Sequence, residues 1–298
     1  MRIVTRPDFD GIVCAVLLFE ALYIKHPVIW VEPNHMQNGL VDIQNEDIIA
    51  NLPYDERCAF WFDHHYTNQI DTPFKGTFKN APSAAGIIFA YYKHRLQRDY
   101  SELVQAADKI DSADLTLDEV LHPENYPYVL LSLTVSNDDQ PDEPYWNKLV
   151  ELFRKYDIGQ VLKDPEVKLH CQSVVAQNDR YVDFVKKHTS LNQNVSITDL
   201  RALDKTPGGN RFLVYSLFPD TVANMRIRYE DKNKETIVVN VGHSIFNPNC
   251  NVNVGLMLAD FEGGGHRGAG STRFHVSKAD EYIPEMINIL LKNENNEI

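Results

Sequence analysis

The sequence has few of the features that mark disulfide-bonded or membrane proteins. Cysteine is scarce, and the four cysteines are scattered without a Cys-x-x-Cys pair: Cys14, Cys58, Cys171 and Cys250. No signal peptide precedes the first apolar residues, so we expect reduced, buried thiols in a cytoplasmic protein. No apolar run approaches the ~18 residues that a bilayer-spanning helix needs. The most hydrophobic stretch, residues 12–23, is short and contains Glu20, which argues against a membrane protein.

Basic residues are also in short supply. The chain has 29 Lys and Arg against 42 Asp and Glu, a net charge of -13. This balance argues against a surface that coats a long polyanion such as duplex DNA. Any anionic substrate must therefore meet a local cluster of metal or basic groups, and short substrates are favoured over long nucleic acid.

A length of 298 residues is twice the ~150 typical of one domain, so we expect two domains. In the first half, short apolar runs alternate with helical patterns, which predicts α/β architecture with a parallel sheet and crossover helices. The predicted strands are residues 2–5, 27–32, 47–50 and 59–62. The predicted helices are residues 11–25, 83–96 with Ser83 as N-cap, 101–109, 144–156 and 164–187.

The last of these helices is long, polar on one side and free of glycine, which is typical of a connecting helix. We therefore predict a catalytic domain at residues 1–163, a connecting helix at 164–190 and a smaller mixed α/β domain at 191–298. Turn signals divide the second domain into predicted strands at 195–199, 211–218, 223–229, 236–242 and 271–275, with helices at 252–261 and 278–292.

Two polar clusters follow predicted strands. Asp8 and Asp10 come after the first strand, and Asp63-His64-His65 after the fourth. In an open parallel sheet, ligands bind at the carboxyl edge of the strands. Paired carboxylates suit Mg²⁺ or Mn²⁺, and imidazole can bind a metal or a substrate. Helix capping by the aspartates and solvent-facing histidines are the alternatives for each cluster taken alone.

A third acidic group holds Asp108, Asp111 and Asp114, and the first two lie three residues apart on one predicted helix face. Solvated acids at a helix end would explain this group equally well. On the predicted strand at 223–229, Arg226 and Arg228 share one face and either line a cleft or face solvent.

A fourth cluster is the glycine-rich run at residues 263–270, which is interrupted by His266 and Arg267. Backbone N–H groups of such a loop can bind an anion, and the two side chains add charged donors. A structural turn is the alternative, but the His-Arg insertion favours phosphate binding.

Taken in order, these motifs make the chain resemble the DHH/DHHA1 phosphoesterase superfamily over essentially its whole length. The segment Arg6-Pro7-Asp8-Phe9-Asp10-Gly11 resembles its first motif, His-x-Asp-x-Asp-Gly, except at the leading histidine. Asp63-His64-His65 resembles the motif that names the family, and residues 263–266 its GGGH loop. Exopolyphosphatases, pyrophosphatases, RecJ exonucleases, oligoribonucleases and cyclic dinucleotide phosphodiesterases belong to this superfamily, and the pattern is most similar to exopolyphosphatase-related proteins.

The resemblance implies a ligand set for Mn²⁺ or Mg²⁺, one ion or two: Asp8, Asp10, Asn51, His64 and Asp108, with Asp111 as the alternative to Asp108. It places His65 at the scissile phosphate, and Gly263, Gly264, Gly265, His266 and Arg267 at the substrate phosphates. Asp63 either orients a neighbouring histidine or binds metal. The chain departs from the family where Arg6 replaces a histidine and Asn51 a bridging aspartate, which weakens the first metal position. Arg6 then supplies a fixed positive charge instead.

The resemblance thus implies an enzyme that hydrolyses phosphoester or phosphoanhydride bonds of a short oligonucleotide, nucleotide or polyphosphate through a metal-activated water. The alternative is a weakly active or non-catalytic nucleotide-binding protein with a degenerate metal site. The sequence does not indicate the oligomeric state.

Overall fold

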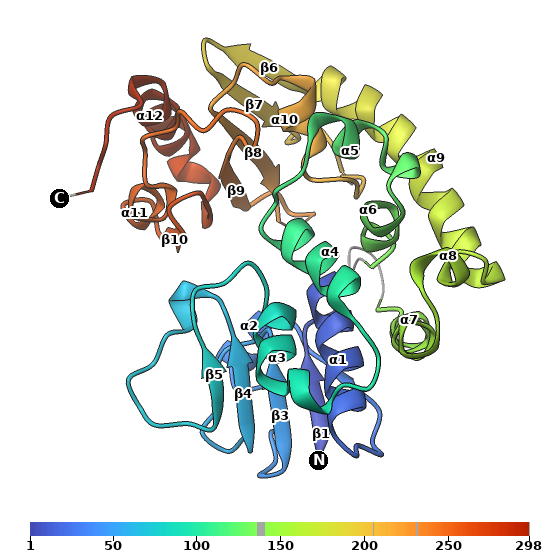
Figure 1. Cartoon of the computed structure of the whole chain (residues 1–298). Coiled ribbons are helices and arrows are strands. Elements are labelled where there is room, and N and C mark those ends of the chain that lie inside the picture. Colours follow the sequence, from blue (N-terminus) through green and yellow to red (C-terminus); the bar gives the residue numbers. More distant parts are fainter. Residues whose placement is uncertain (136–140, 205, 231, 298) are drawn as a thin grey trace. The chain divides into compact units, whose positions relative to one another are not determined.

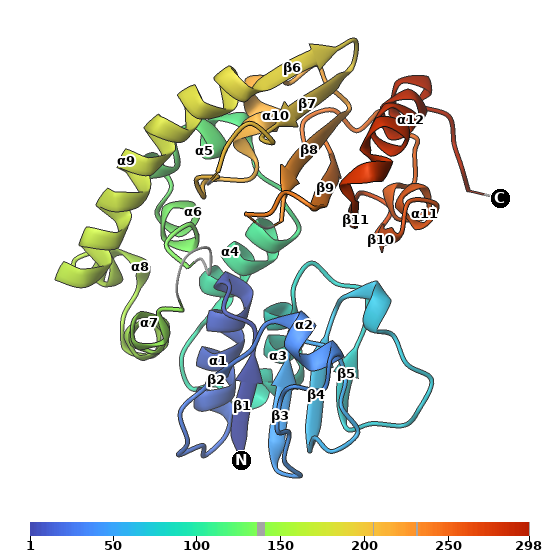
Figure 2. The same cartoon turned by 180° about the vertical axis from the view of Figure 1, so that it is seen from behind.

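The computed structural model of the chain describes residues 1–135, 141–204, 206–230 and 232–297 (Figures 1 and 2). The chain forms two compact units. The first contains residues 1–115 and 123–175, and the second residues 116–122 and 176–298. Among the described residues, no helix is both long enough and apolar enough to span a bilayer.

A parallel sheet forms the centre of the first unit. Over the described residues it has five strands in the order β2-β1-β3-β4-β5, and all neighbouring strands run parallel. The strands are β1 (Arg2–Thr5), β2 (Ile29–Trp30), β3 (Asp47–Ala50), β4 (Phe60–Asp63) and β5 (Gly76–Phe78). Strands β1, β3 and β4 read as continuous apolar runs because both faces of the sheet are covered.

Helices cover both faces of this sheet. Helix α1 (Phe9–Ala21) and helix α3 (Ala84–Tyr92) lie on one face, and α2 (Pro33–Gln37) lies on the other (Figures 1 and 2). Residues 9–18 of α1 are all buried, so this helix is a core element rather than an amphipathic surface helix. The other helices of the unit are α4 (Ser101–Asp111), α6 (Pro127–Ser132), α7 (Glu143–Lys155) and α8 (Ile158–Val161).

The strand register fixes where a ligand can bind. Thr5 pairs with Ala50, and Ala50 pairs with Phe62, so β1, β3 and β4 end at the same level. From β1 the chain moves outward to β2, whereas β3 lies on the opposite side of β1. Such a reversal of strand order opens a crevice at the carboxyl ends of the two strands. The polar segments that follow β1, β3 and β4 meet at this edge.

Helix α9 (Pro165–His188) begins in the first unit and ends in the second, because the division falls after Val175. The short helix α5 (Leu117–Leu121) belongs to the second unit although it precedes α6 in the chain. It is held there by the Asn210 side chain, whose Nδ2 donates to the Val120 carbonyl at 3.2 Å.

The second unit is built on a mixed sheet. Counting the described residues, it has six strands in the order β10-β11-β9-β8-β7-β6, and only β7 and β8 run parallel. They are β6 (Thr189–Asn192), β7 (Val195–Asp199), β8 (Ala223–Tyr229), β9 (Thr236–His243), β10 (Gly263–Gly265) and β11 (Ala269–His275). Helices α11 (Val254–Ala259) and α12 (Ala279–Lys292) pack on one face and close an apolar core. The predicted fold class is α/β, with a parallel sheet and crossover helices in one part and a smaller mixed α/β part. This prediction is confirmed.

One predicted strand is wrong. Residues 211–218 form no strand, and their centre is helix α10 (Leu213–Leu217). The aromatic and β-branched side chains suggested a strand, but Asn210 turns the chain just before the helix, where its Oδ1 accepts the N–H of Phe212 at 3.1 Å. Leu213, Val214 and Ser216 then share the buried side of a single helical turn. Strands β5, β6 and β10 were not predicted.

Each cysteine is a free thiol. Cys14, Cys171 and Cys250 are buried, as expected, and Cys58 is only partly buried.

Candidate metal centre

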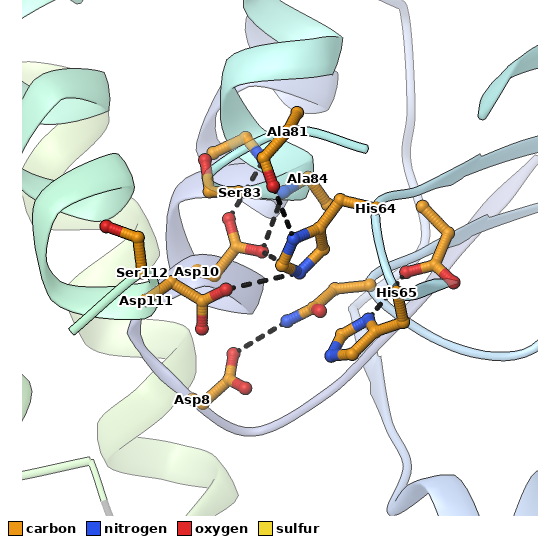
Figure 3. A network of polar contacts seen from close by, with 12 residues as sticks. Asp8, Asp10, His64, His65, Ala81, Ser83, Ala84, Asp111 and Ser112 are labelled. Atoms are coloured by element: carbon orange, nitrogen blue, oxygen red, sulfur yellow. Dashed lines mark hydrogen bonds and ion pairs between the residues drawn. The ribbon is translucent and has the colours of Figure 1, made fainter. Parts of the chain in front are cut away.

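Acidic and imidazole side chains from four segments meet at the carboxyl edge of the parallel sheet (Figure 3). Asp8 and Asp10 lie at the start of α1, Asn51 directly after β3, His64 and His65 directly after β4, and Asp111 at the end of α4. The structure therefore brings together most of the residues that the sequence singled out.

Asp10 is buried against the N-terminus of α3. Its Oδ2 accepts the N–H of Ala84 at 3.0 Å and its Oδ1 the N–H of Ala85 at 2.9 Å. These donors are the unpaired amides of a helix start, whose dipole favours a negative charge. Even so, burial, together with the nearby carboxylates of Asp111 and Asp8, raises the pKa of Asp10 far above its usual range. The site has more negative charge than its own cations balance.

His64 is held in one orientation. Its Nδ1 lies 3.0 Å from the carbonyl of Ala81, and since a carbonyl can only accept, Nδ1 carries the proton in this contact. Nε2 is then left for a second partner, the arrangement found in metal-binding histidines. Nε2 lies 3.1 Å from Asp111 Oδ2 and 3.9 Å from Asp10 Oδ2, yet it makes no well-aligned hydrogen bond with the described residues. Burial opposes the charged imidazole, but the two carboxylates outweigh it and raise the pKa of His64.

The structure separates the two aspartates that the sequence left as alternatives. Asp111 reaches His64. Asp108, one helical turn earlier, accepts the hydroxyl of Ser83 through its Oδ1 at 2.6 Å. Ser83 in turn caps α3 by accepting the N–H of Gly86. A Cβ atom on Gly86 would lie 2.7 Å from Asp108 Oδ1, so Asp108 joins α4 to the start of α3.

Asp8 has partners for both oxygens. It caps α1, as its alternative interpretation predicted, because Oδ1 accepts the N–H of Gly11 at 2.8 Å. Oδ1 also accepts Nδ2 of Asn51 at 2.9 Å, and Oδ2 lies 3.2 Å from Arg6 Nε. Arg6 and Asn51 thus turn their N–H donors toward Asp8, where a metal ion would need ligand oxygens.

Asn51 has a left-handed backbone, with φ at 57°, which asparagine tolerates better than most residues. The side chain is 1% exposed, and its Oδ1 is buried without a hydrogen-bond partner among the described residues. A buried oxygen without a partner costs free energy, so it is a natural place for a ligand or an ion.

Asp63 is fully buried and orients His65. Its Oδ1 lies 2.8 Å from His65 Nδ1, and its Oδ2 accepts Nδ2 of Asn68 at 2.7 Å. Of the two roles open for Asp63, orientation of a neighbouring histidine fits these contacts, and the neighbour is His65. The opposite nitrogen of His65, Nε2, is then available for a substrate.

The residues present fit one divalent cation better than two. Among the described residues, two groups of three place their ligand atoms within 4.8 Å of one another: Asp63, His64 and His65, and Asp10, His64 and Asp111. The first group is weaker because it has a single carboxylate, which already orients His65 through Nδ1. The second combines two carboxylates with an imidazole whose Nε2 lacks an aligned hydrogen bond, and a cation there would relieve the carboxylate crowding.

Several residues that support the site were not predicted from the sequence. Asn68, Ala81 and the backbone amides of Ala84 and Ala85 all fix site residues. The available signal was the small-residue run Ser83-Ala84-Ala85-Gly86 at a predicted helix start, which leaves the first amides accessible to a carboxylate.

In the second unit, the glycine-rich run is a hairpin rather than an open loop. Residues 263–265 form β10, which pairs with β11, and the His266 N–H donates to the Ala269 carbonyl. A Cβ at Gly263 would meet Ser271 O at 2.5 Å, and Gly265 has a φ of 151°, so both positions need glycine. Arg267 Nη1 pairs with Glu297 at 2.5 Å. Packing therefore explains several of these glycines without a ligand.

Gly264 differs from its neighbours. A Cβ there would meet nothing within 4 Å in the described residues. Neither packing nor backbone conformation requires glycine at this position.

Comparison with known proteins identifies the family. The chain is 30% identical to the pGpG-specific phosphodiesterase PggH of Vibrio cholerae, with a TM-score of 0.81 over 98% of this chain and 99% of that one. The chain belongs to the DHH/DHHA1 phosphoesterase superfamily. The resemblance inferred from the motifs is thereby confirmed.

More distant members of the DHH/DHHA1 superfamily share the fold at low identity. An exopolyphosphatase-related protein of Bacteroides fragilis is 13% identical with a TM-score of 0.56, over 98% of this chain and 93% of that one. RecJ of Thermus thermophilus in complex with Mn²⁺ is also 13% identical, with a TM-score of 0.57, over 99% of this chain but 52% of that one. No family model matches the chain, and no curated protein matches it either.

Proposed function

We propose that this DHH protein is a metal-dependent phosphodiesterase that hydrolyses short linear dinucleotides, with pGpG as the first candidate substrate. The observation that carries the proposal is the partly buried Asp10–His64–Asp111 group, in a chain 30% identical to a pGpG-specific phosphodiesterase. The net charge of -13 further favours a short substrate.

In this proposal, Asp10, His64 and Asp111 hold one divalent ion, Mn²⁺ or Mg²⁺. When bound, such an ion supplies Lewis-acid chemistry, lowering the pKa of a water and neutralising phosphate charge. The overall reaction adds one water across the P–O3′ bond of pGpG and releases two molecules of GMP. His64 is kept in the metal-binding tautomer by the Ala81 carbonyl.

Two further residues of the first unit act on the phosphate itself. His65, oriented by Asp63, donates from Nε2 to a phosphate oxygen. Arg6 stands where the family has a metal-binding histidine, and its guanidinium provides a permanent positive charge. Its contact with Asp8 raises the pKa of Arg6 further, so the charge is present at every working pH.

The remaining assignments concern which part of the chain carries the chemistry and which part binds the substrate. We propose that residues 1–163 carry the chemistry and residues 191–298 bind substrate, with residues 164–190 connecting them. Gly263, Gly264, Gly265, His266 and Arg267 would then contact substrate phosphates, as the GGGH resemblance implies.

A second candidate function is a binding protein with little or no turnover. One observation favours it: at the first metal position, both oxygens of Asp8 are already taken, one by Asn51 Nδ2 and the other by Arg6 Nε. Loss of a two-ion arrangement removes the clamp on attacking and leaving oxygens that two-metal enzymes use.

The deciding experiment is a product assay with the purified chain in Mn²⁺, Mg²⁺ or EDTA. The panel is pGpG, a cyclic dinucleotide, pAp, pyrophosphate and short polyphosphate. We expect GMP from pGpG with Mn²⁺, none in EDTA, and loss of activity in Asp10→Asn but not in the exposed control Asp114→Asn. Binding of pGpG without turnover would contradict the proposed enzyme and support the second candidate, a binding protein. Cleavage of pyrophosphate or polyphosphate with pGpG left intact would overturn the substrate class.

A further inference from the structure

Two arginines of the second unit differ in their partners. Nε of Arg226, on β8, is buried and has no hydrogen-bond partner among the described residues, which contradicts its interpretation as a solvated strand arginine. Arg267, in the glycine-rich hairpin, has a carboxylate partner from the same unit, because its Nη1 lies 2.5 Å from Glu297 Oε2. The contacts around Glu297 show how this partner is kept in place.

The segment that follows α12 is docked on the segment that leads into α11. Asn293 Oδ1 accepts the N–H of Asn251 at 2.7 Å, and Asn293 Nδ2 donates to the Asn249 carbonyl at 2.8 Å. Asn296 repeats this pattern, because its Oδ1 accepts the N–H of Asn253 at 2.6 Å and its Nδ2 donates to the Asn253 carbonyl at 3.1 Å. An amide side chain that both accepts and donates in this way reproduces the backbone pairing of a neighbouring strand. We call residues 293–297 the docked segment.

Glu297 is held by both of its carboxylate oxygens. Oε1 accepts Nδ2 of Asn253 at 2.8 Å, and Oε2 is the atom that contacts Arg267. The hydrogen bond from Arg267, with smaller help from Asn253, holds the pKa of Glu297 below its usual value. The docked segment therefore presents a charged carboxylate to Arg267.

The docked segment and the glycine-rich hairpin contact the same helix start. The His266 carbonyl of the hairpin accepts the N–H of Gly255 in the first turn of α11 at 2.9 Å. Asn253, which pairs with the docked segment, is the N-cap of the same helix. Both partners of the ion pair between Glu297 and Arg267 are thus fixed against α11, and the pair lies wholly within the second unit.

A carboxylate on Arg267 uses the donors that a phosphate would use. Guanidinium N–H groups bind carboxylate and phosphate oxygens in the same paired geometry. The side chains of Arg267 and Glu297 are 50% and 41% exposed, so solvent reaches the pair and its contribution to stability is small. An incoming anion can therefore replace Glu297 at little cost.

We propose that the docked segment is an internal competitor for anions at the glycine-rich hairpin. Glu297 takes the place of a phosphate group on Arg267, and a bound phosphate has to displace it. The assignment of Arg267 to a substrate phosphate rests on the proposed function, whereas the competing contact rests on the hydrogen bonds of the docked segment. Removal of the Glu297 charge should then strengthen the binding of phosphate-bearing ligands.

The experiment titrates pGpG and inorganic pyrophosphate into the full chain by calorimetry in EDTA, where hydrolysis is absent. We expect Glu297→Gln to bind both anions about 2- to 5-fold more tightly than the wild type, the range that an exposed ion pair allows. Asn296→Ala loosens the docked segment but keeps the carboxylate, so its gain should be smaller.

Two controls separate this contact from a general change in charge. Glu294→Gln removes the same charge from an exposed residue of the docked segment that contacts no cation among the described residues, and it should bind both anions like the wild type. In an Arg267→Gln background, the added Glu297→Gln change should have no effect, because the two side chains act on each other.

Equal affinity of the wild type and Glu297→Gln for both anions would overturn the proposal, and so would an equal gain in Glu294→Gln. A gain that persists in the Arg267→Gln background, or the absence of binding in every variant, would overturn it as well. The expected gain in a chain that does not cleave pGpG with Mn²⁺ would support the internal competitor and contradict the proposed phosphodiesterase activity.

Discussion

The two sheets of the molecule gather opposite charges. At the carboxyl edge of the parallel sheet, Asp8, Asp10 and Asp111 crowd together, and burial and mutual repulsion raise the pKa of Asp8 and Asp10. On the polar face of the mixed sheet, Arg226 and Arg211 line a cavity without any carboxylate among the described lining residues. The first region has more carboxylates than its cations balance, and the described lining of the second has no carboxylate.

This difference in charge indicates which ligand each region favours. Carboxylates around an unsatisfied imidazole nitrogen favour a metal cation, and guanidinium groups with an unpaired buried N–H favour an anion. A metal-dependent phosphodiesterase needs both, and the comparison predicts that charge-removing substitutions in the two regions act on different measurements. Substitutions at the metal centre should lower turnover, and substitutions at the mixed sheet should weaken substrate binding.

The largest effect should come from Asp111→Asn. Loss of a direct metal ligand should cost more than the 10- to 100-fold that outer partners typically cost, so we expect kcat/KM for pGpG to fall by more than about 100-fold. Asp108→Asn is the matched change one turn earlier, where the carboxylate only accepts the Ser83 hydroxyl. It should lower stability by about 1 kcal/mol and leave activity within a few-fold. Steady-state kinetics and thermal unfolding of both variants test this, and a larger activity loss in Asp108→Asn would reverse the assignment.

The same pair shows where sequence reasoning reached its limit. The motifs gave the family, the parallel sheet and the edge where the site lies, because strand ends and glycine runs are local signals. The choice between Asp108 and Asp111 depends on how α4 rotates against α3, which long-range packing decides. Spacing alone places both carboxylates on one helix face.

Two other features depended on context in the same way. Residues 211–218 contain strand-forming side chains, yet the Asn210 turn and burial on one side produce α10. The glycine run was predicted as a loop, but its first three residues pair with β11 across the hairpin. Backbone pairing leaves no mark on a stretch of glycines, since it requires no particular side chain.

An intermediate effect is expected for Arg6→Gln. If the Arg6 guanidinium stands in for a second ion, its removal should lower kcat/KM for pGpG by about 10- to 100-fold, the range for a hydrogen bond to a charged group. Metal content, measured by mass spectrometry of the native protein, should stay near one Mn²⁺ per chain. Arg57→Gln removes the same charge from an exposed pair with Asp55 and should change neither quantity.

Arg6→His provides the opposing test. It restores the histidine of the family motif beside Asp8, while Asn51 still points its amide nitrogen at the same carboxylate. A rise in both Mn²⁺ stoichiometry and turnover would show that Arg6 blocks a second ion rather than replacing it.

The smallest effect should come from Gly264→Ala. The added methyl group meets nothing within 4 Å in the described residues, so the melting temperature should stay nearly unchanged. A substrate phosphate that approaches the backbone of β10 would meet the methyl group, and we expect KM for pGpG to rise by up to about 10-fold with little change in kcat. Gly159→Ala, where the new Cβ would meet Asp157 Oδ1 at an ordinary 3.4 Å, serves as the matched control. An unchanged KM in Gly264→Ala would contradict a substrate contact at the glycine run. The arginine-lined cavity would then be the candidate anion-binding site of the mixed sheet.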